Sequence, residues 1–458
     1  MDASAAADGD SKGTVVDTPQ PTIKPVEAKE RIGSIDVLRG CALLGILAVN
    51  ISFFAYPDAV MMDPTVIGGF SGANLWVWKI IQVVFYQKTM TLFSMLFGAG
   101  LILFAARVTA KGGDARKVYY RRILWLLVIG LCHAYLLWNG DILVYYAICG
   151  LLLYLFRKLS PVKLLIIGFI LMGVGSVVQM GIGAGIGYVR ERAIAAQEAV
   201  DAGETPADDD RQWMTMWSQM KVGFEPSEEF IDGEVEAFQG GYGDVWLHRL
   251  PYLIQMQIFG FIFMIGWKVG GLMLWGMALM KLAVFSAERS FRFYWLCLVI
   301  GYGVGIPLSA YAAGDMIAHD FDIARSFLFD WQIDNVAALF VSFGHIGAVM
   351  LICKRGFFGW MTNRLAAVGR MALTNYLMTT VICTTIFYGY GFGLFGEIER
   401  IGLAGFVAAI WIVQLAYSPV WLKHFRFGPA EWLWRALTYG RRPAMRIVEH
   451  AKEVSPAA

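Results

Sequence analysis

The sequence predicts an all-α polytopic membrane protein with about ten transmembrane helices and both termini in the cytoplasm. Three observations predict it. Of 458 residues, 57% are hydrophobic and only 16% are charged, whereas soluble domains carry about 25% charged residues. Apolar runs of about 18–25 residues recur along the chain, each long enough to cross a bilayer. Lys and Arg gather in every second connection between these runs.

The apolar runs give the predicted spans in order. A short interfacial helix is expected at 74–85, ahead of the second span. The sixth run, 250–280, is interrupted by Gly266, Gly270 and Gly271, which favours a kink or a tilt. The spans are placed at about 33–55, 86–107, 120–138, 141–157, 162–188, 250–280, 292–312, 333–353, 371–390 and 402–420.

The charges of the connections set the predicted orientation. Lys and Arg cluster in 107–122 and recur in alternate connections and in the tail after the last span, while the connections between them carry Asp and Glu. Loops rich in Lys and Arg stay in the cytoplasm. This alternation therefore places both termini there. The basic connections are 107–122, 157–163, 281–292, 354–370 and the tail from 423, and the acidic ones are 58–63, 315–330 and 397–399.

Composition divides the chain into five parts. Residues 1–31 are rich in Ala, Asp, Ser and Pro and predict a disordered cytoplasmic tail. A bundle of about five helices follows at 32–189. The region 190–249 is an acidic loop on the outer side. A second transmembrane region occupies 250–442, and 443–458 form a cytoplasmic tail.

The acidic loop 190–249 carries one helical pattern. Trp213, Met216, Trp217 and Met220 recur at helical spacing, so part of the loop is expected to be an amphipathic helix on the bundle or on the bilayer. A solvated cap without chemistry is the alternative for this loop.

Several function classes are excluded or disfavoured. The formal net charge is +2, so no bulk charge favours nucleic acid. The six cysteines lie singly in apolar runs, which predicts neither a disulfide framework nor a metal site. The sequence contains no phosphate-binding loop, and no dinucleotide-binding pattern occurs between a strand and a helix.

The first polar group inside a predicted span includes Asp36, Arg39 and Asn50. Asp36 and Arg39 are three residues apart and neighbours on one helical face. Arg39 and Asn50 are eleven apart, which is three turns or about 16 Å along the same face. This stripe must face the bundle interior, because ionisable groups in lipid are costly. Arg39 is either an anion contact or the partner of Asp36 in a structural ion pair.

The second polar group holds His133 and, eight residues later, Asp141. Asn139 and Gly140 predict a tight turn after the third span, and Asp141 is expected to cap the fourth. A histidine within reach of a carboxylate near a cavity is a candidate general base or acyl carrier. A histidine hydrogen-bonded between helices is the alternative.

Two further polar groups lie in later spans. His345 is eleven residues beyond Asp334 and so on the same helical face. It is either a buried neutral histidine or a relay for a proton or acyl group. Arg370 and Asn375 open the ninth span. Arg370 can extend to the cytoplasmic surface, and both residues suit either an anion contact or bonding between helices.

These segments resemble the YeiB-type bacterial inner-membrane proteins, whose C-terminal region is named domain of unknown function 418. The resemblance covers about 32–442. It rests on Asp36…Leu38-Arg39-Gly40…Asn50, Phe93-Ser94…Phe97-Gly98, His133…Trp138…Gly140-Asp141, Gly369-Arg370…Asn375-Tyr376 and Phe425-Arg426-Phe427-Gly428-Pro429…Glu431-Trp432.

More distantly, the chain is similar to the transmembrane acyltransferase superfamily, which includes the lysosomal heparan glucosaminide acetyltransferase. That resemblance implies an acyl-CoA donor on the cytoplasmic side, a membrane-embedded histidine and an acceptor on the far side. The reactive histidine of the glucosaminide enzyme follows its first span, whereas residues 51–120 here contain no histidine. His133 would take that role.

The expected function is therefore that of an inner-membrane acyltransferase. His133, Asp141 and His345 are the candidate catalytic residues. Acyl-CoA is the expected donor, without a metal, and an envelope glycan, lipid or small molecule is the acceptor. The other expected partner is the lipid bilayer, with no nucleic acid and a homo-oligomer left open. The candidate substrate- or cofactor-binding residues are Asp36, Arg39, Asn50, Arg370 and Asn375.

Two other functions remain open. A transporter or exporter of a small solute or lipid would use the polar stripes and the interrupted run 250–280 as its path. A non-catalytic membrane scaffold would use the same polar residues for folding alone.

Overall fold

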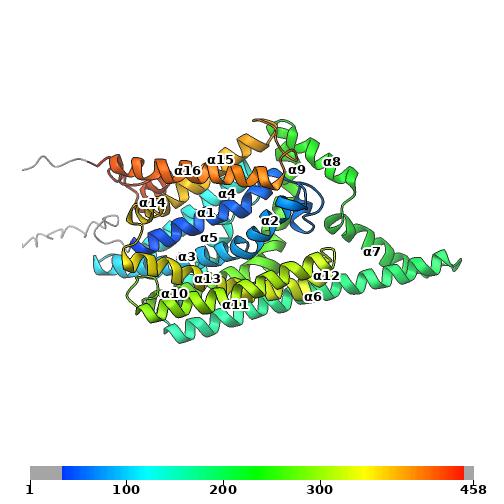
Figure 1. The fold of residues 1–458 in the computed structure, drawn as a ribbon, viewed down its shortest axis with the longest axis horizontal. Helices are drawn as coiled ribbons and strands as arrows, with labels where there is room; N and C mark the ends of the chain where they lie inside the picture. Colours follow the sequence, from blue (N-terminus) through cyan, green and yellow to red (C-terminus); the bar gives the residue numbers. More distant parts are fainter. Residues whose placement is uncertain (1–32, 448–458) are drawn as a thin grey trace, which may run out of the picture.

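A computed structural model describes residues 33–447 of the chain (Figure 1). Within that range the regular structure is helical, and β pairing is limited to one isolated bridge between Phe425 and Arg446. Among residues 33–447, eight helices are long and apolar enough to cross a membrane. A bent pair of helices, Gly359–Arg370 and Ala372–Phe387, makes nine if it counts as one span. The prediction of an all-α, multi-pass membrane protein is confirmed.

The bounds of the helices follow the apolar runs closely. The α-helices are α1 (Gly33–Ala55), α2 (Gly72–Ile80), α3 (Lys88–Ala110), α4 (Ala115–Cys132), α5 (Leu143–Leu153), α6 (Pro161–Asp201), α7 (Asp208–Phe224), α8 (Glu228–Gln239), α9 (Tyr242–Gln255), α10 (Gly266–Lys281), α11 (Phe291–Ala318), α12 (Ile323–Arg325), α13 (Trp331–Arg355), α14 (Gly359–Arg370), α15 (Ala372–Phe387), α16 (Arg400–His424) and α17 (Pro429–Tyr439). The π-helical segments are η3 (Ile81–Phe85), η4 (His133–Leu137), η6 (Met256–Ile265) and η7 (Ser326–Asp330), and the 3₁₀ turns are η2 (Asp58–Met61) and η5 (Tyr154–Phe156).

Two segments differ in detail from their predicted spans. The fourth predicted span, 141–157, contains α5 of 11 residues and the short turn η5, which together are shorter than a span of about 20 residues. In the sixth, the ten-residue π-helical segment η6 separates α9 from α10 and ends at Ile265, directly before Gly266. The expected interruption is thus a change of helix type in front of the glycines.

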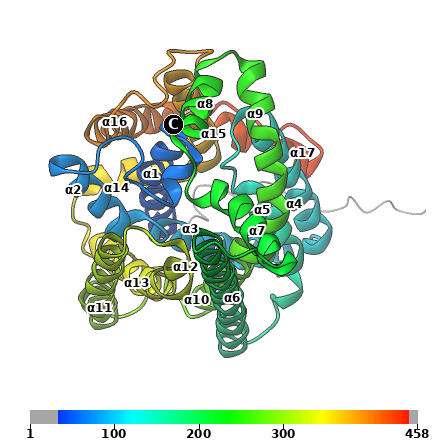
Figure 2. The same cartoon turned by 90° about the vertical axis from the view of Figure 1, so that its right-hand side faces the viewer.

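The two ends of the described chain lie at the same end of the bundle (Figure 1). Predictions for the tails 1–31 and 448–458 fall outside the described residues. Figure 2 looks onto the opposite end, where α7, α8 and α9 lie over the bundle. The expected amphipathic helix is α7. Its Trp217 and Met220 pack on Ile186 of α6 and on Phe327.

Helices α3 and α10 approach closely through glycines. A Cβ added at Gly98 would overlap the Met273 carbonyl, and one at Gly276 would overlap the Met95 carbonyl. The neighbouring Gly100 has open space instead. Gly98 thus sets the spacing of α3 and α10, and Gly100 does not.

We expect Gly98→Ala to destabilise the protein by about 1–3 kcal/mol, because the new methyl group forces two packed backbones apart. Gly100→Ala is the matched control and should leave the thermal midpoint unchanged or slightly raised. Thermal unfolding of both variants in the same detergent measures the difference. Equal midpoints for the two variants would contradict the contact.

Candidate functional site

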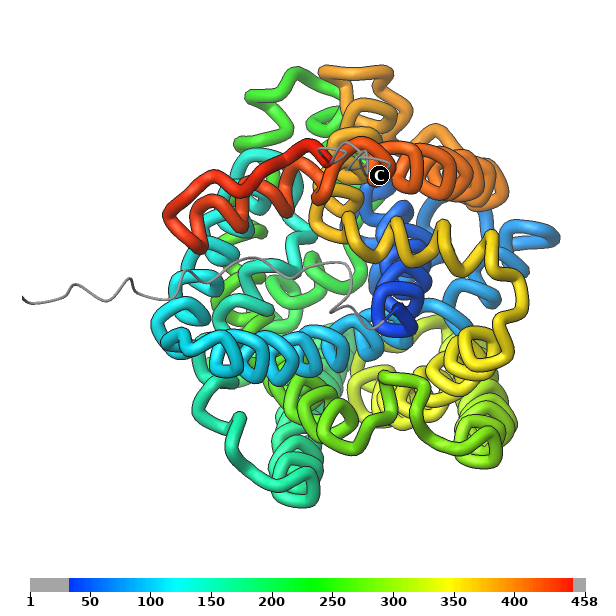
Figure 3. Tube along the Cα trace, turned by 90° about the vertical axis from the view of Figure 1, so that its left-hand side faces the viewer, coloured from blue at the N-terminus to red at the C-terminus, as the bar shows by residue number. Residues whose placement is uncertain are grey.

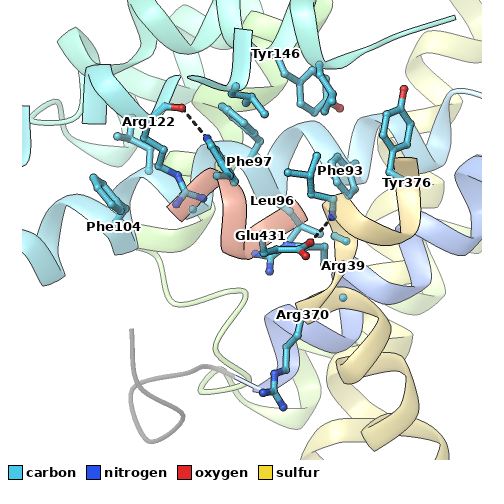
Figure 4. A pocket seen from close by; sticks show the side chains of 18 of the residues that line it. Arg39, Phe93, Leu96, Phe97, Phe104, Arg122, Tyr146, Arg370, Tyr376 and Glu431 are labelled. Carbon is cyan, nitrogen blue, oxygen red and sulfur yellow. Dashed lines mark hydrogen bonds between the residues drawn. The ribbon is translucent and has the colours of Figure 1, made fainter. Parts of the chain in front are cut away.

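A cavity of about 280 Å³ opens between α1, α3, α4 and α17. It lies at the end of the bundle that carries both ends of the described chain, which Figure 3 faces. Figure 4 shows Arg39, Arg122 and Glu431 around it. Its charged lining residues are Arg39, Arg107, Arg122, Arg370, Arg435, Asp36 and Glu431, and its aromatic ones include Phe93, Phe97, Phe104, Tyr119, Tyr146, Tyr376, Trp434 and Tyr439. We call this space the arginine cavity.

The arginine cavity favours an anion. Five guanidinium groups line it against two carboxyl groups. Arg39 bonds Asp36 at 3.0 Å. Burial raises the pKa of the Glu431 carboxyl, and hydrogen bonds from Leu373 and Thr374 oppose the shift. Arginine clusters of this kind bind phosphate groups through charge-assisted hydrogen bonds.

Glu431 also holds the cavity wall together. One carboxyl oxygen accepts the backbone N–H groups of Leu373 and Thr374, and the other accepts the Thr374 hydroxyl. These N–H groups belong to the first turn of α15, where no intrahelical acceptor exists. Glu431 on α17 therefore caps α15 from a distance in sequence of nearly sixty residues.

The second anchor of α17 lies on α4. The Arg122 guanidinium stacks 3.7 Å from the ring centre of Trp434, and the Trp434 indole N–H donates to the Arg122 carbonyl at 2.8 Å. These contacts hold α17 against α4 beside the cavity, although Arg122 and Trp434 are far apart in the sequence.

A second, narrower cavity continues the first along α1. Leu43, Ile46 and Tyr376 line both spaces. Asn50 lines only the deeper one, together with residues of α15. The α1 residues that line the two cavities include the polar Asp36, Arg39 and Asn50, and also Ile35, Leu43, Ile46, Leu47 and Phe54. The predicted polar face of the first span therefore borders both cavities, which we call the interior path.

His133 lies beside the deeper cavity and is 2% exposed. Its Nδ1 is 2.7 Å from Asp141 Oδ1, and its Nε2 is 2.9 Å from the Thr380 hydroxyl. Thr380 lines the deeper cavity. With Asp141 ionised, Nδ1 carries the proton and Nε2 presents its lone pair to the hydroxyl. A hydroxyl, an imidazole and a carboxylate in this order form the arrangement that activates oxygen nucleophiles.

The local backbone explains how His133 and Asp141 meet. Helix α4 ends at Cys132, and the π-helical turn η4 begins at His133. After the following turn, Asp141 Oδ2 accepts the Val144 N–H at 2.8 Å and caps α5, as the sequence predicts. Arg249 of α9 donates to the Tyr135 and Leu137 carbonyls. Arg249 thus supplies hydrogen bonds to carbonyl groups at the end of η4 that have no partner within the helix.

The structure brings most of the proposed site residues to this path, with two exceptions. Asn375 is fully buried and bonds Val368, Ser418 and Tyr417. This position fits the structural alternative for Asn375. His345 bonds the Tyr302 hydroxyl at 2.8 Å and the Val84 carbonyl at 3.2 Å. None of these contacts joins His345 to His133.

Sequence reasoning gave no site role to several residues of the path. Arg107, Arg122 and Arg435 lie in the predicted basic regions, but no single one of them was predicted as a site residue. Thr380 and Glu431 carried no signal, because their partners are remote in sequence. Across residues 33–447, no group of three or more His, Cys, Asp or Glu side chains could hold a metal ion.

The end of the bundle opposite the arginine cavity holds a carboxyl pair, formed by Asp58 and the buried Glu234. The Asp58 N–H donates to Glu234 Oε1 at 3.0 Å, which joins η2 to α8. Burial raises the pKa of Asp58 to about 8, and the nearby Glu234 adds to this shift. Burial also raises the pKa of Glu234. Burial thus disfavours the charged form of each carboxyl.

This pair predicts a dependence on pH. A carboxyl with a raised pKa in the folded state stabilises it most at low pH, and the contribution is lost as the pH rises through that value, about 8 for Asp58. We expect amide hydrogen exchange of α8 to show weaker protection at pH 8 than at pH 5, after correction for intrinsic rates. Asp58→Asn should remove most of that difference, and Glu236→Gln, an exposed neighbour, should not. An unchanged difference in Asp58→Asn would contradict the role of the pair.

Comparisons with known proteins agree with the resemblance seen in the sequence. The family model described as "Protein of unknown function (DUF418)" matches residues 279–441. The uncharacterized protein YeiB of Escherichia coli is 30% identical over 423 residues, which cover 89% of this chain and 96% of that protein. The uncharacterized protein YxaH of Bacillus subtilis is 30% identical over 426 residues, covering 91% and 96% respectively. No solved structure matches the chain.

Proposed function

Since this chain belongs to the YeiB-type family of membrane proteins with a DUF418 region, we propose that it is an acyltransferase of the bacterial cytoplasmic membrane. It takes an acyl group from cytoplasmic acyl-CoA and passes it to an envelope or periplasmic acceptor. The observation that carries this proposal is the path along α1 from the arginine cavity to the Thr380 hydroxyl that His133 binds.

The arginine cavity suits the donor. The phosphate groups of coenzyme A are polyanionic and would bind among Arg39, Arg122 and Arg435, which lie on three different helices. The pantetheine arm is a long, slender chain that would follow the α1 face past Tyr376. The deeper cavity measures only about 10 Å³, so the side chains that line it would have to move for the thioester to reach His133.

The orientation follows from the same proposal. The arginine cavity lies at the end of the bundle that carries both ends of the described chain and the basic connections. With that end in the cytoplasm, the donor enters from the side where acyl-CoA is made. His133 is eighteen residues beyond the start of α4, about 27 Å farther toward the outer face.

His133 would act as a general base. Its Nε2 accepts the proton of the acceptor hydroxyl, and the acceptor oxygen attacks the thioester carbonyl carbon. The new C–O bond forms, the C–S bond breaks, and the departing thiolate takes up a proton to give the free thiol of coenzyme A. Asp141 holds the ring and stabilises the imidazolium. The Thr380 hydroxyl marks where an acceptor hydroxyl meets Nε2.

The proposal is tested by ligand-dependent thermal stability of the full chain in mild detergent. Acetyl-CoA at a concentration of about 100 Kd should stabilise the protein by about 2.7 kcal/mol, and coenzyme A should stabilise it as well. A nucleotide without the pantetheine arm, such as AMP, should stabilise it much less. No shift with acetyl-CoA, together with solute uptake by proteoliposomes, would contradict the proposal and favour a transporter.

A further inference from the structure

A second polar centre lies away from the arginine cavity, where the helix before α3 breaks. The π-helical segment η3 ends at Phe85, and α3 begins at Lys88. Between them Gln87 has a positive φ of 62°, which is uncommon outside glycine. Broken helices at membrane depth expose backbone carbonyls, and such breaks recur at ion and proton sites.

Lys88 is fully buried at this break. Its amino group donates to the Gln82 carbonyl at 2.8 Å, to the Ser309 hydroxyl at 2.7 Å and to Asp334 Oδ1 at 2.5 Å. Three acceptors match the three N–H donors of an ammonium group, and one acceptor is a carboxylate. Lys88 is therefore a charged group paired with Asp334.

Lys268 on α10 has a different set of partners. Its amino group donates to Gln87 Oε1 at 2.8 Å and to Asn335 Oδ1 at 2.6 Å. Both acceptors are neutral amide oxygens, and two acceptors match the two N–H donors of an uncharged amine. The Asp334 carboxylate already forms an ion pair with Lys88. A second ammonium here would leave one net positive charge in the membrane, which is costly.

The same centre has an acceptor ready for a third donor. Asp334 lies next to Asn335 in α13, and its Oδ2 is buried without a hydrogen-bond partner among the described residues. The other polar groups of this centre are neutral: Gln87 and Asn335 accept from Lys268, Gln179 accepts from Asn335, and Ser309 lies between Lys88 and Asp334. The remaining titratable neighbours are Lys88, Tyr86 and His345, the last of which bonds the Val84 carbonyl of η3.

We propose that Lys268 is a proton-binding site, with Asp334 Oδ2 as the acceptor for the added N–H. Uptake of one proton from water converts the amine to an ammonium group, and release restores the amine. The helix break, Lys88 and Asp334 form the fixed part of the site, and Lys268 is the group that changes charge.

The site differs from the proposed acyl-transfer path in its residues and helices. Of the residues that form it, none lines the arginine cavity or the deeper cavity. The proton site therefore holds or fails independently of the acyltransferase proposal. His345 is a neighbour of this proton site, because its ring bonds the Val84 carbonyl of η3.

Nuclear magnetic resonance tests the charge of Lys268 directly. Full-length protein with ¹³Cε-labelled lysine is placed in lipid nanodiscs and titrated from pH 6 to pH 10. We expect one Cε signal to keep the shift of an uncharged amine down to at least two units below the ordinary lysine pKa of about 10.4. It should disappear in Lys268→Gln. Ammonium shifts for every lysine up to pH 9 would overturn the proposal.

A pair of substitutions supplies a second readout. Lys268→Gln keeps two neutral N–H donors, whereas Lys268→Arg carries a charge that cannot be released. The thermal midpoint of Lys268→Gln should stay within about 3 °C of wild type, and that of Lys268→Arg should fall by more than about 5 °C. The reverse order, or equal losses in both variants, would show that Lys268 is a structural cation or a packing residue instead.

Discussion

Replacing His133 with alanine is expected to reduce acyl transfer from acetyl-CoA by about 10²–10⁴-fold, the usual contribution of a general base. The reason is geometric, because Nε2 is the basic atom closest to the deeper cavity, 2.9 Å from Thr380. The measurement is transfer of radiolabelled acetyl groups into lipid- or sugar-extractable material by membrane vesicles that contain the protein. His424→Ala, an exposed histidine at the other end of the chain, is the matched control.

A variant of Asp141 separates catalysis from folding. Asp141→Asn keeps an oxygen that can cap α5 at Val144, so the fold should be retained. Its amide N–H faces Nδ1 and favours the ring tautomer with the proton on Nε2, which removes the base. We expect transfer to fall about as far as in His133→Ala, with an unchanged thermal midpoint. Full transfer in either variant would contradict the role of the pair.

The second large effect concerns donor binding. Arg39→Ala and Arg435→Ala should each raise the Kd for acetyl-CoA by about 10–100-fold, because a hydrogen bond to a charged group contributes about 1.5–3 kcal/mol. Both side chains line the arginine cavity. The Kd is measured by equilibrium dialysis of labelled acetyl-CoA, and it should rise with salt in wild type.

Arg292→Ala is the matched control for the two arginine variants. Arg292 is an exposed arginine in a basic connection and does not line the cavity. Arg292→Ala removes the same single positive charge as Arg39→Ala or Arg435→Ala. If donor binding depends on the arginines of the cavity rather than on net charge, the Kd of Arg292→Ala should change by less than about twofold. Equal losses in all three variants would refute a specific phosphate site.

The first span and the His133 loop show what the sequence could predict. Helical periodicity alone placed Arg39 and Asn50 on one face, and both residues border the interior path. The turn after His133 brought Asp141 back within hydrogen-bond reach, as the spacing of eight residues suggested. These predictions succeeded because they needed only one helix or one turn.

The contacts that could not be predicted join distant parts of the chain. Thr380 reaches His133 across 247 residues, and Glu431 reaches Thr374 across 57. Such pairs depend on how helices pack, and a single sequence does not contain that information. The ion pair of Lys88 with Asp334 is of the same kind, because it joins residues 246 positions apart.

The most direct test of the central claim uses the sidedness of membrane vesicles. Labelled acetyl-CoA is supplied either to inside-out vesicles, which expose the cytoplasmic face, or to right-side-out vesicles. The account predicts acetyl transfer in inside-out vesicles only, with loss of that transfer in Arg39→Ala and His133→Ala. Transfer that is equal in vesicles lacking the protein, or that is unaffected by both substitutions, would contradict it.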